Sequence, residues 1–176
     1  MRGGSIAGLM FGLLSCFVAV AATAASAPKI VEVRDLSRAA ALSRQQHVPL
    51  MLMFSAKGCS YCTVLEDDFL RPMLLSGDYT EKVLIRKVDV DAGNLRDFDG
   101  QPIASAALAA RYKVVVTPTL VFVDPQGRQL AQRMVGLSTP DMYGGYLDET
   151  INVALGRFKA QRTLAGECRP SASVTC

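Results

Sequence analysis

Two cysteines separated by two residues, Cys59 and Cys62, have a spacing that favours thiol chemistry. At the start of a helix, cysteines at this spacing lie one turn apart on one face, at a separation that suits a disulfide. The first sulfur then lies where unpaired backbone N–H groups stabilise negative charge, so the thiolate is favoured. We therefore expect Cys59 to attack a target disulfide, and the more shielded Cys62 to resolve the mixed disulfide.

Other roles are known for a Cys-x-x-Cys pair. A zinc site usually takes four ligands from two such pairs, and this chain has no second close pair and a single histidine, His47. Covalently attached haem needs a histidine directly after the second cysteine, where Thr63 stands. We therefore predict that no metal and no cofactor takes part. A purely structural bridge remains open.

The flanking sequence predicts a buried strand that leads into the helix with this pair. Residues 48–54 (VPLMLMF) form an apolar run typical of a strand covered on both faces. A turn follows, and then a helix from Cys59 to Phe69 that is disturbed near Pro72. The order of all predicted elements gives an α/β fold, a mixed central sheet with helices on both faces. The other predicted elements are an edge strand at 30–33, a helix capped by Asp35, strands at 83–90, 114–123 and 130–135, a turn at 124–127, and helices at 104–112 and from Pro140 onward.

Composition and the N-terminal segment predict an exported protein. The chain has 176 residues, and its net charge of +3 gives too weak a field to indicate a nucleic-acid binder. Arg2 precedes an uncharged apolar segment with a small-residue end, which is typical of a signal peptide. The same segment is long enough for an uncleaved membrane anchor, and residues 13–16 resemble a lipoprotein box that would place a lipid on Cys16. All three alternatives place the rest of the chain outside the cytoplasm, and we predict the periplasm.

The predicted domain organisation is simple. We expect a signal peptide at 1–27, a domain at 28–164 and a polar C-terminal tail at 165–176. The tail contains Cys168 and Cys176, and whether they pair with each other is left open. Residues 92–105 are predicted as a solvated insertion.

The motifs FSAKGCSYC, KVDVD and YKVVVTPTLVFVDPQG lie between residues 35 and 158 and resemble the thioredoxin superfamily. Within it, the chain is similar to exported bacterial members such as the SoxW-type proteins and the C-terminal domain of the electron hub DsbD. The resemblance implies a thioredoxin-like fold and a thiol:disulfide oxidoreductase. It implies a cis peptide bond between Thr117 and Pro118, whose backbone would pair with an extended substrate segment beside the disulfide. Ser60 and Tyr61 would contact the substrate at the same place.

Departures from thioredoxin concern the handling of the proton. The chain has no Trp, and Met53 stands six residues before Cys59, where thioredoxin has a buried Asp. Glu66 is our candidate replacement, because it lies four residues after Cys62 on the same helical stripe and could accept the proton of that thiol. The DsbD domain has a Glu at this spacing. A merely solvated Glu66 stays open, as does Lys87 as the partner of an acid near the site.

The expected function is thiol:disulfide exchange outside the cytoplasm. We expect an exported thiol:disulfide oxidoreductase that reduces or exchanges disulfides of periplasmic proteins and contributes to cell redox homeostasis. As a monomer, it would receive electrons from a membrane donor of the DsbD type. The alternative is a non-catalytic thioredoxin-fold module that holds a peptide, with Cys59 and Cys62 permanently bridged.

Overall fold

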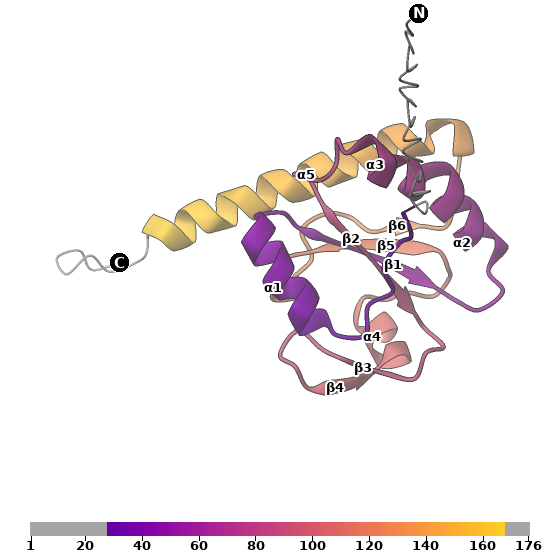
Figure 1. Ribbon diagram of the computed structural model, residues 1–176, viewed down its shortest axis with the longest axis horizontal. Coiled ribbons are helices and arrows are strands. Elements are labelled where there is room, and N and C mark those ends of the chain that lie inside the picture. The colour runs from indigo at the N-terminus through magenta and orange to yellow at the C-terminus, as the bar shows by residue number, and fades with distance from the viewer. Residues whose placement is uncertain (1–27, 168–176) are drawn as a thin grey trace, which may run out of the picture.

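The computed structural model describes residues 28–167, which form a central sheet with helices on both faces (Figure 1). The predicted signal peptide, Cys16, and the question of a Cys168–Cys176 pair lie outside the described residues. No helix within residues 28–167 is both long enough and apolar enough to cross a membrane. The elements are α1 (Leu36–Gln46), β1 (Leu50–Ser55), α2 (Ser60–Leu65), the π-helical η1 (Glu66–Leu70), α3 (Arg71–Ser76), β2 (Leu84–Asp89), β3 (Asn94–Arg96), β4 (Pro102–Ala104), α4 (Ser105–Arg111), β5 (Thr119–Val123), β6 (Met134–Val135) and α5 (Pro140–Glu167).

Strand β1 lies inside the main sheet, whose strand order is β2–β1–β5–β6. It pairs in parallel with β2 and antiparallel with β5, so the predicted mixed sheet is confirmed. Every residue of β1 is buried, as its apolar sequence predicts. Because Phe54 lies opposite Thr119, the end of β1 and the start of β5 meet at one edge of the sheet. The turn before Cys59 and the Thr117–Pro118 bond are therefore brought to the same edge.

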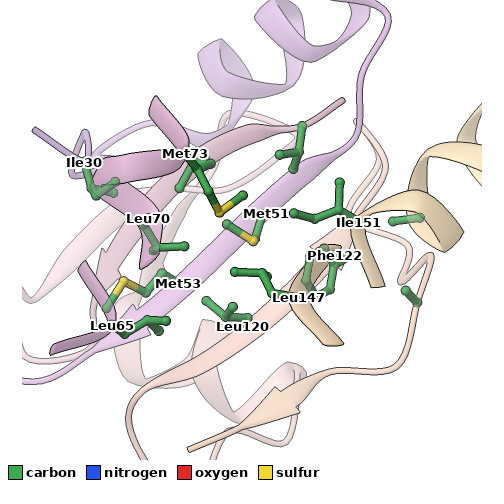
Figure 2. Packing of buried hydrophobic residues seen from close by; sticks show 14 of the residues in the cluster. Ile30, Met51, Met53, Leu65, Leu70, Met73, Leu120, Phe122, Leu147 and Ile151 are labelled. Atoms are coloured by element: carbon green, nitrogen blue, oxygen red, sulfur yellow. The ribbon is translucent and has the colours of Figure 1, made fainter. Parts of the chain in front are cut away.

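Two apolar clusters pack on the two faces of the sheet. Figure 2 shows the cluster in which Met51, Met53 and Phe122 of the sheet meet side chains of α2, η1, α3 and α5. The opposite cluster joins α1 and α4 to the sheet. One apolar stripe of α5 is buried in the first cluster and forms part of the core. That stripe comprises Tyr143, Leu147, Ile151, Ala154 and Phe158.

Three predicted strands are reduced to half of their expected length or less. The strand predicted at 114–123 begins only at Thr119, and Val115 is 85% exposed. Pro118 has no N–H to donate to a sheet, and the residues before it form an irregular segment. Of residues 130–135, only the last two form a strand, and the segment at 30–33 is reduced to an isolated bridge between Glu32 and Lys87.

The helix with the cysteine pair is interrupted earlier than predicted. A π-helical turn begins at Glu66, and α3 then starts with Pro72 in its first turn. A proline ring clashes with the carbonyl of the fourth residue before it, and the widened turn relieves that clash. Residues 92–105, predicted as a solvated insertion, contain the β3–β4 hairpin. Helix α5 continues to Glu167, past residue 165 where the tail was predicted to begin.

Two buried tyrosines predict opposite effects of removing a hydroxyl. The Tyr112 hydroxyl donates to the Gly127 carbonyl at 2.8 Å, whereas the Tyr143 hydroxyl is buried with no partner among the described residues. Burial raises the pKa of Tyr143 to about 12. We expect Tyr112→Phe to lower the free energy of unfolding by about 1–2 kcal/mol, and Tyr143→Phe to leave it unchanged or raise it by up to about 1 kcal/mol. Urea denaturation of both variants checks this, and equal losses would contradict it.

Candidate active site

The Cys59–Cys62 disulfide lies at the N-terminus of α2, where the chain leaves β1. The two Cα atoms are 5.3 Å apart. Cys59 is the N-cap of α2, and its Sγ accepts a hydrogen bond from the Cys62 N–H at 3.1 Å. Cys59 is partly exposed, whereas Cys62 is only 3% exposed. An attacking thiolate needs an accessible sulfur next to N–H donors, and Cys59 has both.

A tight turn before Cys59 sets the direction in which the helix begins. Gly58 has a φ of 74°, in the left-handed region that a residue without a Cβ adopts without strain. The Asp91 carboxylate, which follows β2, accepts a hydrogen bond from the Lys57 N–H at 2.9 Å. Sequence reasoning did not identify Asp91, although its place just after a strand beside the site was a usable signal. Lys57 itself is exposed.

Glu66 is held by an ion pair, which decides against a merely solvated side chain. Its carboxylate accepts hydrogen bonds from the Lys87 Nζ at 2.9 and 3.3 Å. The Glu66 side chain is 16% exposed and that of Lys87 25%. Lys87 lies on β2, directly beside Met53 of β1 in the parallel register. The carboxylate therefore has a fixed position between the helix and the sheet.

A cavity of about 330 Å³ connects this ion pair to the cysteines. Cys59, Cys62, Glu66 and Lys87 all line it, together with Ser60. Among these lining residues, Glu66 has the only carboxyl group. Met53 stands at the position of the buried acid in thioredoxin and is fully buried in the apolar cluster (Figure 2). Its thioether has no ionisable group that could accept a proton from a cysteine. The arrangement offers one candidate proton acceptor for a cysteine thiol.

The other predicted substrate contacts, Tyr61 of α2 and the Thr117–Pro118 bond, line one cavity. The Thr117–Pro118 bond is cis, as the resemblance implies. Tyr61, which is 64% exposed, lines a cavity of about 190 Å³ with both of these residues. The Pro118 carbonyl accepts from the Gly136 N–H at 2.8 Å, but the Thr117 backbone forms no hydrogen bond within residues 28–167. Gly136 and Leu137 complete this cavity and were not identified from the sequence, because they follow a strand of only two residues.

The structure thus places the predicted site residues in two neighbouring groups. Ser60 lies with the cysteines and Glu66, whereas Tyr61 lies with Thr117 and Pro118. Their roles stay predictions. Within the described part of the chain, no group of three or more His, Cys, Asp or Glu side chains could hold a metal ion.

Known proteins are similar to this chain in sequence and fold. The model of the thioredoxin-like domain family matches residues 36–151. Disulfide bond reductase DsbH of Chlamydia pneumoniae is 31% identical over 91 residues, which are 51% of this chain and 54% of that protein. The chain therefore matches about half the length of this curated relative. A solved structure of a DsbH oxidoreductase is 25% identical to this chain, with a TM-score of 0.51. The match covers 74% of this chain and 88% of the DsbH chain. A thioredoxin of Fasciola hepatica is 22% identical with a TM-score of 0.47, covering 70% and 97%.

Proposed function

We propose that this chain, which belongs to the thioredoxin-like domain family, catalyses thiol–disulfide exchange through Cys59 and Cys62. The observation that carries the proposal is the asymmetry of the disulfide. One sulfur is accessible and accepts an N–H at the start of a helix, while the other is buried beside a cavity that contains a paired carboxylate. A structural disulfide requires neither the accessible sulfur nor the neighbouring acid.

The exchange begins from the reduced form. The Cys59 thiolate attacks one sulfur of a target disulfide, forms a mixed disulfide, and releases the other target sulfur as a thiolate. Glu66 accepts the proton of Cys62, directly or through one water. The Cys62 thiolate then attacks the Cys59 sulfur and releases the second target thiolate. The target has gained two electrons, and the chain has lost them in forming the Cys59–Cys62 disulfide, which a donor dithiol must reduce again.

The Thr117 side of the site supports binding of an extended target segment. Because the Thr117 backbone forms no hydrogen bond within the described residues, its N–H and C=O are available to pair with a substrate backbone. Tyr61 adds an exposed aromatic surface next to this backbone. Ser60 is also exposed, on the side of the cysteine cavity. We assign Thr117, Pro118, Ser60 and Tyr61 to substrate binding.

We assign the activity to the periplasm, and we assign its direction as reduction of target disulfides. The name of the relative DsbH, a disulfide bond reductase, favours this direction. The N-terminal 27 residues would be removed as a signal peptide, leaving a domain at 28–164 and a short tail at 165–176. Disulfide-containing periplasmic proteins would be the targets, and a membrane donor of the DsbD type would supply electrons to a monomer.

The reduction potential of the Cys59–Cys62 pair tests this proposal. We expect about −200 to −270 mV in glutathione buffers, with the lower end favouring a reductase. The measurement uses residues 28–176 with Cys168 and Cys176 replaced by Ser, so that tail thiols do not contribute. A potential below about −300 mV with slow exchange would favour the non-catalytic peptide-binding module with a structural bridge. A value near about −120 mV would reverse the proposed direction.

A further inference from the structure

A second cavity lies at the end of the sheet opposite the disulfide. The register pairs Phe54 with Thr119 near the cysteines and Leu50 with Val123 at the far end, where the turn after β5 begins. Residues from the end of α1, this turn and α5 line a cavity of about 410 Å³. The volume is within the range of small-molecule sites. This cavity and the cysteine cavity lie at opposite ends of the sheet and share no lining residue, so a site here is independent of the proposed exchange reaction.

A buried carboxylate fixes one arginine at the mouth of this cavity. Asp124 is 1% exposed, and its Oδ1 accepts hydrogen bonds from the backbone N–H groups of Gln126 and Arg128, at 2.8 and 2.9 Å. Its Oδ2 accepts from the Arg128 Nε at 2.6 Å. The two Nη groups of Arg128 have no hydrogen-bond partner in the described part of the chain. Asp124 therefore holds the guanidinium in place and leaves its outer edge free to bind an anion.

Two more arginines complete a positively charged rim. Arg44 comes from the last turn of α1 and Arg162 from α5, and both line the cavity with Arg128. Neither forms an ion pair within residues 28–167; Arg44 only donates to the Pro125 carbonyl at a long 3.5 Å. Since Asp124 is the only acid among the lining residues, three arginines and one carboxylate leave an excess of two positive charges there. Like charges around one cavity repel each other, and a bound anion relieves that repulsion.

We propose that this cavity binds an organic dianion with an apolar group. The excess charge matches a phosphate monoester or a pair of carboxylates, which guanidinium groups bind through two parallel hydrogen bonds. Phe158 is 3% exposed and lines the same cavity, so it provides an apolar wall for the rest of the ligand. A free metabolite and an acidic, aromatic segment of a partner protein both have this chemistry.

Calorimetric titration of the full chain with phenylphosphate tests the site. We expect saturable binding with a Kd below about 1 mM, and weaker binding of the monoanion benzoate. Arg44→Gln and Arg162→Gln should each weaken phenylphosphate binding about tenfold, because each removes one charged hydrogen-bond donor. Arg38→Gln is the matched control, since Arg38 lies in the first turn of α1, pairs with Asp35 at 3.5 Å, and does not line the cavity.

Two outcomes would overturn the proposal: absence of saturable phenylphosphate binding to the unaltered chain, or equal affinity of the Arg44→Gln/Arg162→Gln double variant. Circular dichroism of the variants shows whether these exposed substitutions leave the fold intact. Competition with a peptide of one Phe and two Glu distinguishes the source of the ligand. Displacement of phenylphosphate supports a protein segment as the natural ligand, and failure to displace it supports a free organic phosphate. The redox measurements above do not depend on either result.

Discussion

Cys59→Ser is expected to abolish disulfide reduction, whereas Cys62→Ser should stop the reaction at the mixed disulfide. Only the thiolate is nucleophilic enough to attack a disulfide, and Cys59 is the sulfur that substrates can reach. We expect Cys59→Ser to lower the exchange rate about 10³-fold or more. Cys62→Ser keeps the attacking sulfur but removes the resolving thiol, so targets stay covalently bound. Single-turnover reduction of a disulfide peptide measures the first effect, and non-reducing gels of periplasmic extracts show the trapped complexes.

The control for this pair of variants concerns the other cysteines. Cys168 and Cys176 are replaced by Ser in every protein compared, so that any trapped complex must form through the active-site pair. Complexes that persist in Cys59→Ser would assign the attack to Cys62 and contradict the proposed order. If Cys62→Ser traps no target, the peptide-binding module with a permanent bridge becomes the better description.

The elements determined by local sequence were predictable. Asp35 caps α1 by accepting from the Arg38 N–H at 3.1 Å, and the turn at 124–127 closes with a hydrogen bond from Gly127 to Asp124. Both depend on residue preferences within four positions of the chain. The buried strand β1 and the helix α5 were also predictable from the sequence. An element that packs against the core on both faces has a continuous apolar run, and one that packs on a single face has apolar residues at a regular spacing.

Features determined by distant contacts were only partly predictable. The helical stripe singled out Glu66, but the ammonium group of Lys87 comes from a strand 21 residues away, and spacing alone does not show that the two meet. High β-propensity extended the predicted strand at 114–123 over Val115, although that side chain is largely exposed and does not pack into the core formed by residues 28–167. The cavity with the arginines joins three elements that are far apart in sequence, and no local motif marks it.

Glu66→Gln is expected to slow resolution of the mixed disulfide about 10²-fold while leaving the attack by Cys59 nearly unchanged. Glutamine has the same shape but cannot accept the proton of Cys62. That proton then has to be transferred to solvent. Stopped-flow measurement of the two steps separates them, and the slowed step should gain rate with rising pH as hydroxide replaces the carboxylate. Asp67→Asn is the matched control, because the neighbouring Asp67 is exposed and pairs with Arg71 at 2.9 Å, outside the cysteine cavity. Equal slowing of both variants, or of both steps, would indicate a structural effect.

A carboxylate moved to position 53 distinguishes a proton acceptor from a structural ion pair. Met53 is the register partner of Lys87 and packs in the same cluster as Leu65 at the end of α2, so an acid there faces the same ammonium group from the sheet. In the Glu66→Gln background, Met53→Asp should recover about tenfold of the lost rate of resolution, because an acceptor is restored below the cysteines. The same change should lower the free energy of unfolding by about 2–4 kcal/mol, since it replaces a fully buried apolar side chain by a polar one. A recovered rate of resolution in a less stable protein would show that the acid acts as a proton acceptor and not by stabilising the fold. Unchanged slow resolution would mean that the position of Glu66, rather than the presence of an acid, determines the rate.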